Sequence, residues 1–329
     1  MRRVLATLLL VTGCEADAPS GGARDGGAGD DAEFVDDAGP EIDADVSVPD
    51  VLGVPTGCVA GRATADRPDD TPYDQLRVLY VTPSDGPDLQ RDTSGILCNS
   101  VRGIATWFEG QAGAALRLDT AGGLLDIGFV RLGKTDAQMR GTDATNLSID
   151  TGIAFVRERI ERELRAAGMI AANKLYAVYY EGTSSYACGG GAYPPLIVGR
   201  VGAMYLRAPS GASTCADVRP WGRASLVPEY IDYGMLHETL HSMGYVPAAA
   251  LNQHSAGHAY DTTAAEPARD ILYSPRPGQP DPPWAVAHPG GLLLDINGDD
   301  YFGTSSTRDL SRSSLLAPRP ANARPPVGW

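Results

Sequence analysis

Residues 76–81 read Leu-Arg-Val-Leu-Tyr-Val, a compact run of apolar and β-branched side chains that Pro83 closes. A short run of this kind, bounded by a turn residue, is typical of a buried β-strand. Apolar residues then recur at helical spacing over residues 97–108, and Gly110 follows them. A strand followed at once by such a helix is the beginning of an α/β pattern.

The same alternation continues to residue 206. Further strands are expected at 116–118 and 126–130, then a helix over 153–164, and then strands at 175–180 and 196–206. Alternating strands and helices predict an α/β fold with a mostly parallel sheet. After residue 245 the regular pattern fades into Pro, Gly, Asp and Ser.

The charge of the chain is unevenly distributed. Its 329 residues carry 41 acidic and 27 basic side chains, a formal net charge of −14. Residues 15–50 alone hold twelve acids and one base, and almost no large apolar side chain. Such a segment cannot bury enough surface to fold, so residues 14–56 are expected to form an acidic disordered tether. The acidic balance argues against a nucleic-acid partner.

The N-terminus has the features of an export signal. Residues 1–13 combine a basic start, a short apolar run and small residues. Val11-Thr12-Gly13-Cys14 resembles the bacterial lipobox, which implies acylation of Cys14, palmitate included. We therefore expect an exported bacterial lipoprotein, periplasmic or on the cell surface, anchored in the membrane by lipid. An ordinary signal peptide with a chance cysteine is the alternative.

The folded domain is expected to span residues 57–329, with an upper part at about 70–244 and a lower part at about 245–329. In an exported chain its four cysteines suggest disulfides, for which three pairings exist. We favour the pairs 58–98 and 188–215, formed by Cys58, Cys98, Cys188 and Cys215. A cysteine zinc site is disfavoured because no Cys-x-x-Cys pair exists.

His237-Glu238-Thr239-Leu240-His241 is the motif that carries chemistry. On a helix both histidines lie on one face, so both imidazoles can bind one zinc ion while Glu238 lies beside it as a general base. Four of the five histidines lie between residues 237 and 258, and residues 1–236 contain none. Such clustering is what the ligands of one metal ion would produce.

Residues 237–244, His-Glu-Thr-Leu-His-Ser-Met-Gly, resemble the opening of the metzincin zinc-protease signature. The third histidine of that signature would fall at position 247, which is Pro here. We favour His258 as the third ligand because Gly257 before it and Asp261 after it suit a tightly held turn. The alternatives are His254, Asp261 and, in a gluzincin-type arrangement, Glu266.

Residues 270–273, Asp-Ile-Leu-Tyr, lie where metzincins have a turn with Met beneath the metal. Leu272 replaces that Met, and Tyr273 is a candidate for transition-state support or, alternatively, a packed aromatic. Residues 76–301 as a whole resemble uncharacterised secreted bacterial proteins with His-Glu-x-x-His-x-x-Gly followed by Gly-His. The resemblance implies a metzincin-like zinc-peptidase fold with a twisted, mostly parallel sheet, an active-site helix and an irregular C-terminal subdomain.

The loop at residues 295–300, Asp-Ile-Asn-Gly-Asp-Asp, alternates oxygen-bearing side chains around a turn glycine. Some Ca²⁺ loops have this pattern, but the bidentate Glu at the expected distance is missing. A polar turn is the alternative to a Ca²⁺ site.

These features together predict a membrane-tethered, exported zinc metalloendopeptidase. His237, His241 and His258 would bind one Zn²⁺ ion, and a zinc-activated water with Glu238 as general base would hydrolyse a protein or peptide substrate. The strand at 196–206 is expected to be an edge strand that binds the substrate backbone. The alternatives are a non-catalytic lipoprotein that binds zinc or a partner, and a metal-dependent hydrolase of a non-peptide bond.

Overall fold

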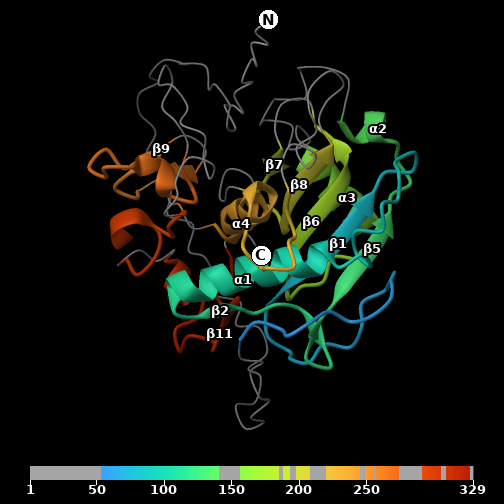
Figure 1. Ribbon diagram of the computed structural model, residues 1–329, viewed down its shortest axis with the longest axis horizontal. Coiled ribbons are helices and arrows are strands. Elements are labelled where there is room, and N and C mark those ends of the chain that lie inside the picture. The colour runs from blue at the N-terminus through green and yellow to red at the C-terminus, as the bar shows by residue number, and fades with distance from the viewer. Residues whose placement is uncertain are drawn as a thin grey trace, which may run out of the picture.

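A computed structural model describes residues 53–140, 156–184, 188–192, 198–207, 220–244, 246, 249–254, 257–273, 291–304, 309–326 and 329. Their centre is a five-stranded sheet of order β5-β1-β6-β8-β7 (Figure 1). The first four strands run parallel and β7 pairs antiparallel with β8. The predicted α/β class and the mostly parallel sheet are confirmed. The strands are β1 (Gln75–Thr82), β5 (Ile127–Arg131), β6 (Lys174–Thr183), β7 (Gly189–Gly190) and β8 (Val201–Arg207).

Helices cover both faces of this sheet. Val78 and Tyr80 of β1 belong to the core cluster that also holds the apolar residues of α1 (Ile96–Ala112) and α4 (Tyr230–Met243). Leu79 and Val81 belong to the cluster that contains the apolar residues of α2 (Asp136–Arg140) and α3 (Val156–Ala166). Because both faces are covered, every residue of β1 is buried, and five of its eight side chains are Leu, Val or Tyr.

The strand at 196–206 is not at the edge of the sheet, and that expectation was wrong. β8 lies between β6 and β7, and Gly189 and Gly190 of β7 pair with Met204 and Ala203. The edge strand therefore comes from the Gly-rich segment, which carries no strand propensity and so gives no strand signal in the sequence.

α4 begins and ends at recognisable signals. Glu229 and Asp232 form a reciprocal capping box at its start. Gly244 ends it with φ 84°, a left-handed conformation in which glycine avoids steric strain. The helix thus ends where the sequence predicts, and it presents the His-Glu-x-x-His motif from its second and third turns.

The C-terminal region beyond α4 is irregular, as expected. It lies beside α4, on the opposite side of the sheet from β5 (Figure 1). Its last strand pairs with β2 (Ala115–Leu116), which follows α1. A separate hairpin of β3 (Thr120–Ala121) and β4 (Leu124–Leu125) encloses a Gly122-Gly123 turn. The short elements beyond α4 are β9 (Gln253–His254), β10 (His258–Ala259), η4 (Pro267–Arg269), η5 (Ile296–Gly298), η6 (Leu310–Arg312) and β11 (Leu316–Ala317).

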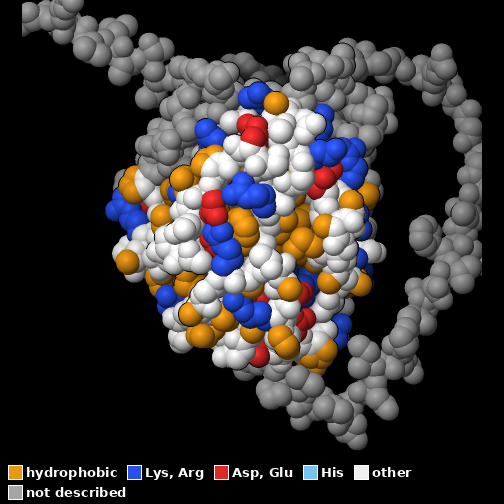
Figure 2. Space-filling view, turned by 90° about the vertical axis from the view of Figure 1, so that its right-hand side faces the viewer, with side chains coloured by type: hydrophobic (Ala, Val, Ile, Leu, Met, Phe, Trp, Pro, Cys, Tyr) orange, Lys and Arg blue, Asp and Glu red, His pale blue; other side chains and the backbone are white. Residues whose placement is uncertain are grey.

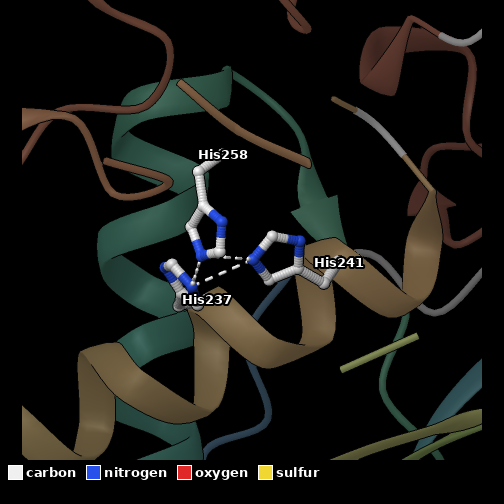
Figure 3. Close-up of side chains that lie close together, drawn as sticks. All are labelled: His237, His241 and His258. Atoms are coloured by element: carbon white, nitrogen blue, oxygen red, sulfur yellow. Dashed lines mark hydrogen bonds between the residues drawn. The ribbon is translucent and has the colours of Figure 1, made fainter. Parts of the chain in front are cut away.

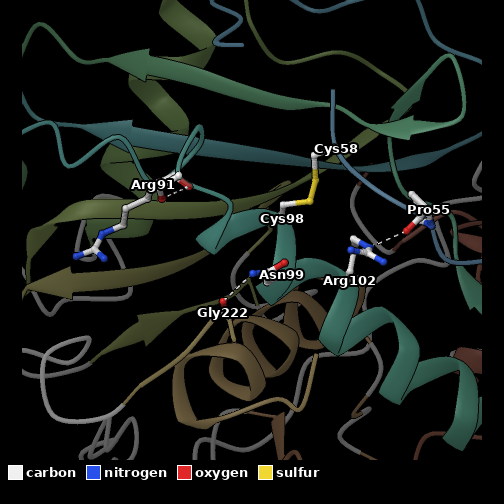
Figure 4. Close-up of a disulfide and its surroundings, with 8 residues drawn as sticks. Pro55, Cys58, Arg91, Cys98, Asn99, Arg102 and Gly222 are labelled. Atoms are coloured by element: carbon white, nitrogen blue, oxygen red, sulfur yellow. Dashed lines mark hydrogen bonds between the residues drawn. A yellow bond between two sulfur atoms is a disulfide. The ribbon is translucent and has the colours of Figure 1, made fainter. Parts of the chain in front are cut away.

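The predicted disulfide between Cys58 and Cys98 is confirmed, with Cα atoms 5.9 Å apart (Figure 4). It joins the segment that precedes β1 to helix α1. Beside it, Arg102 of α1 donates a hydrogen bond to the carbonyl of Pro55 at 2.9 Å, so the last residues assigned to the tether contact the folded body. Cys188 is also disulfide-bonded. Cys215, the partner predicted for it, lies outside the described residues.

Cys14, the signal at 1–13 and the tether up to residue 52 also lie outside the described residues. Within the part of the chain that is described, no helix is both long and apolar enough to cross a bilayer. On the face seen in Figure 2, Lys and Arg side chains are interspersed with Asp and Glu side chains.

Candidate metal centre

Three imidazoles converge beside the middle of α4 (Figure 3). Nε2 of His241 lies 3.0 Å from Nε2 of His237 and 3.2 Å from Nε2 of His258. The third side of this triangle, His237 Nε2 to His258 Nε2, is 3.3 Å. All three side chains are buried, and they form one of the residue groups able to hold a metal ion. We refer to them below as the histidine triad.

The structure places His258 beside the two helical histidines, whereas the other candidates for the third ligand have different partners. His254 lies opposite His258 in the β9–β10 pair and contacts the ring of Tyr260 instead. Asp261 accepts hydrogen bonds from the backbone N–H groups of Thr263 and Ala264. Glu266 lies on the surface before η4. Gly257 has φ 81° and so makes the tight turn that was expected before His258.

Close packing against β7 and β8 fixes the position of α4. A methyl group on Gly202 would lie 2.7 Å from the carbonyl oxygen of Glu238, and one on Gly191 would lie 2.6 Å from it. Ser242 adds hydrogen bonds, donating to the carbonyl of Val201 at 3.0 Å and accepting from Ala192 N–H at 3.1 Å. Glycine is needed here because any larger side chain would push the motif helix away from the sheet.

The two imidazoles of the motif helix are held in the neutral form that a metal ligand requires. Burial, helped by the neighbouring His258, lowers the pKa of His237 to about 3. Burial also lowers the pKa of His241 well below its usual value. Nδ1–H of His237 donates to the carbonyl of Ile271 at 2.6 Å, which leaves the lone pair on Nε2, the nitrogen that faces the other two rings.

The donor set fits zinc. Tetrahedral Zn²⁺ with Zn–N bonds of about 2.0–2.1 Å requires ligand nitrogens about 3.3 Å apart. The three Nε2 separations of 3.0–3.3 Å are close to that spacing. A cation among these nitrogens accepts all three lone pairs, whereas a proton bridges only two. Three protein ligands also leave one coordination position for a reactant, as catalytic zinc sites do.

Glu238 lies between the motif helix and the edge strand, where its carboxyl group contacts Gly189 of β7. Its Oε2 atom is buried and has no hydrogen-bond partner among the described residues. Burial raises the pKa of Glu238 to about 8, against the opposing charge of Arg157. A dication beside this carboxyl would favour its ionised form. The group is therefore a buried carboxyl with an oxygen free to exchange a proton.

The turn at residues 270–273 supplies an apolar floor. Leu272 and Ile271 are fully buried in the same core cluster as Leu236 and Leu240 of α4. Tyr273 is 6 % exposed, and its ring lies 5.6 Å from that of Tyr260. This packing fits the aromatic role given above as the alternative to transition-state support.

The loop at 295–300 gathers Asp295, Asp299 and Asp300 within reach of one point. Asp295 already accepts backbone N–H groups from residues 300, 301 and 302. Asp300 accepts from the backbone N–H and the side chain of Asn252. These contacts are those of a polar turn, and a Ca²⁺ ion here stays a prediction.

Three parts of the site are not identified by the sequence analysis. The carbonyl of Ile271 orients His237, but a backbone acceptor leaves no mark on residue type. Ser242 is inconspicuous within the motif helix. The run Gly189–Gly191 has no side chains to mark its role, and only its contact with Glu238 shows why side chains are excluded there.

The chain matches no protein-family model and no curated protein sequence. Among solved structures it is similar to an archaemetzincin (amzA) from Methanopyrus kandleri, with 15% identity over 55% of this chain and 83% of that chain, at a TM-score of 0.28. It is also similar to a chaperone-substrate complex, with 14% identity over 55% of this chain and 25% of that one, at a TM-score of 0.27. Similarities this low carry no inference about this chain.

Proposed function

We propose that this protein is a zinc metalloendopeptidase, exported and tethered to the membrane through Cys14. The observation that carries the proposal is the convergence of three buried Nε2 atoms, 3.0–3.3 Å apart, beside a helix that also carries the buried carboxyl of Glu238. His237, His241 and His258 would hold the ion. A purely structural site has no need of the adjacent Glu238, so its presence favours an enzyme.

Zinc, when bound, supplies a Lewis acid that polarises a scissile carbonyl and lowers the pKa of water. Glu238 takes a proton from the attacking water at Oε2 and delivers it to the nitrogen of the leaving amine. Oε2 suits this role because it is buried and has no hydrogen-bond partner among the described residues. His237 keeps its own proton on Nδ1, held by the Ile271 carbonyl, and does not compete for the reacting proton.

A protein or peptide in extended form is the substrate we propose. β7 is the edge strand next to the carboxyl of Glu238, and an extended backbone can pair with such an edge. Two adjacent glycines leave room for the substrate to approach. The lipid anchor, the signal at 1–13 and the tether at 14–56 are proposed from the sequence alone.

Zinc content and proteolysis of an unfolded protein test this proposal in the full chain. We expect one zinc per chain and chelator-sensitive cleavage. Glu238→Gln should retain zinc and lose about 10²–10⁴-fold in cleavage rate, the usual contribution of a general base. His258→Gln should lose zinc and activity together. His254→Gln is the matched control, a neighbouring histidine outside the triad, and should retain both.

Each failure has a distinct meaning. A purified chain that binds no zinc contradicts the metal site and the enzyme with it. Full activity of Glu238→Gln would refute the assigned base. Zinc binding without cleavage of any peptide or non-peptide ester would leave the non-catalytic lipoprotein, and cleavage of the ester alone would leave a hydrolase of another bond.

A further inference from the structure

The peptide group between Ile271 and Leu272 lies between a buried carboxylate and the histidine triad. Its carbonyl oxygen accepts the Nδ1–H of His237 at 2.6 Å. Its N–H group donates to Oδ1 of Asp270 at 2.7 Å. Because a trans peptide is planar, its N–H and C=O groups point in opposite directions. Asp270 and His237 are thus joined through the two ends of one peptide unit.

A second set of contacts holds Asp270. Its Oδ1 atom also accepts the hydroxyl of Tyr301 at 2.7 Å, and Oδ2 accepts Ile296 N–H at 2.9 Å. The N–H of Asp295 donates to the Tyr301 hydroxyl at 2.8 Å, so the hydroxyl proton is directed at Asp270. Asp270 is 3 % exposed and Tyr301 is 0 % exposed. Water therefore has little access with which to replace these contacts.

The neighbouring backbone leaves this peptide little freedom to rotate. Ile271 N–H donates to the carbonyl of Leu293, and the carbonyl of Leu272 accepts Ala259 N–H, next to His258. The turn at 270–273 therefore forms a hydrogen bond with His237 itself and another with Ala259, the residue that follows His258 in β10. A change in this turn reaches the triad directly.

We infer that Asp270 and Tyr301 are positioning residues for the metal centre, acting on His237 through the peptide group of Ile271 and Leu272. Metal-binding histidines usually donate their second N–H to a carboxylate or a carbonyl, which fixes the tautomer and raises the basicity of the ligand nitrogen. Here the carboxylate of Asp270 does not bond to His237 itself but to the peptide group that His237 bonds. It polarises the N–H end of the peptide, and the carbonyl end becomes a stronger acceptor for His237. The inference rests on the proposed zinc site.

Asp270→Asn tests this relay in the full chain at pH 8 or above, where most of Asp270 is ionised because burial raises its pKa only to about 7. The amide keeps the shape of the side chain but loses its charge. Its NH₂ group is a donor, and it would face the hydroxyl or N–H groups that donate hydrogen bonds to the carboxylate. We expect zinc affinity to fall about 10–100-fold, as for other outer partners of metal ligands. In the metal-free chain, the ¹⁵N shifts of the His237 ring should change from a single Nδ1–H tautomer to a mixture. Substituted Co²⁺ should show an altered absorption spectrum.

Asp309→Asn is the matched control. Asp309 is also a buried carboxylate of the C-terminal region, and it accepts backbone N–H groups from Gly303 and Ser311. Among the described residues these hydrogen bonds do not involve the histidine triad. Asp309→Asn should leave zinc affinity and the His237 tautomer unchanged. Tyr301→Phe removes one hydrogen bond without adding a donor, so it is the variant to use if Asp270→Asn does not fold. We expect Tyr301→Phe to weaken zinc binding about threefold or more and to cause partial loss of the single tautomer.

The outcomes separate this inference from the proposed function. If the unmodified chain binds no zinc, the metal site itself is refuted and the relay with it. If the chain binds zinc while Asp270→Asn, or Tyr301→Phe in its place, keeps unmodified affinity and a single tautomer, the relay alone is refuted. Equal losses of zinc affinity and of the single tautomer in Asp309→Asn would also refute the relay. They would show that Asp270 only stabilises the C-terminal loops, as any buried carboxylate there does.

Discussion

The sheet region, residues 75–244, and the C-terminal region, residues 249–326, are built by different interactions. In the sheet region, apolar side chains alternate between two faces that helices cover. In the C-terminal region, buried aspartates organise the backbone. Asp295 accepts three consecutive N–H groups and Asp309 caps η6 through Ser311. The first region is specified by periodicity, and the second by single polar residues.

Ion pairs hold several buried carboxylates of the sheet region, although Asp232 there accepts backbone N–H groups. In the sheet region Asp119 pairs with Arg77 at 3.0 Å and with Lys174 at 2.8 Å. In the C-terminal region the carboxylates of Asp295 and Asp309 accept hydrogen bonds chiefly from backbone N–H groups. An ion pair joins side chains of two elements, whereas a carboxylate on N–H groups determines the path of the chain itself. That difference explains how a region almost without strands holds His258 in place.

Truncation of a core residue of the sheet should give the largest effect on stability. Leu79 is fully buried in the interior strand β1, so Leu79→Ala should lower the free energy of unfolding by about 2–5 kcal/mol. Leu89, which is 51 % exposed, is the matched control, and its Ala variant should change stability by less than about 0.5 kcal/mol. Urea unfolding of the chelated protein measures both. Equal effects of the two variants would contradict the account of the sheet core.

The sheet could be predicted because its signals are local. The apolar run at 76–81 became β1, the helical spacing at 97–108 became α1, and the run at 175–180 became β6. Each segment is buried on both faces or along one stripe, and residue type records that environment. The edge strand β7 was missed because a Gly-Gly pair has no side chain that could record its environment.

The site was only partly accessible to such reasoning. His237 and His241 could be predicted because a helix of about 3.6 residues per turn places residues four apart on one face. Gly257 and Asp261, on either side of His258, favoured it as the third ligand. The alternative His254 could not be eliminated, because which of two histidines on a short antiparallel pair faces the helix depends on tertiary packing. The roles of the Ile271 carbonyl and the Asp270 carboxylate could not be predicted, because they depend on how one peptide group is oriented in the folded chain.

A smaller and more local effect is expected from the carboxylate anchors. Asp295→Asn removes the charge that holds the N–H groups of residues 300–302, which should cost about 1–3 kcal/mol. Hydrogen exchange should show lost protection at the amides of Tyr301 and Phe302, with β1 and β6 unchanged. Asp299→Asn, on the exposed neighbour, should alter neither. Equal loss of protection in the sheet would mean that the two regions unfold as one unit.

The sharpest test of the comparison is the pH dependence of the metal-free protein. The pKa of His237 is lowered to about 3 by burial, so between pH 6.5 and 3 the unfolded chain binds a proton that the folded chain does not. Stability is then lost as the pH falls, by up to about 1.4 kcal/mol per pH unit for each such histidine. His241, whose pKa is also lowered by burial, acts in the same direction.

The aspartates of the C-terminal region act in the opposite direction. Burial raises the pKa of Asp270 to about 7 and that of Asp295 to about 6, so between those values and pH 4 the folded chain binds the extra proton. Their contribution to stability is present at low pH and is lost as the pH rises. In urea unfolding at pH 7.5, 6.5 and 5.5 with a chelator, Asp270→Asn should therefore lose stability more steeply on acidification than the unmodified chain. His237→Asn should lose it less steeply. Parallel curves for all three proteins would show that the two regions do not differ in the sign of their proton linkage.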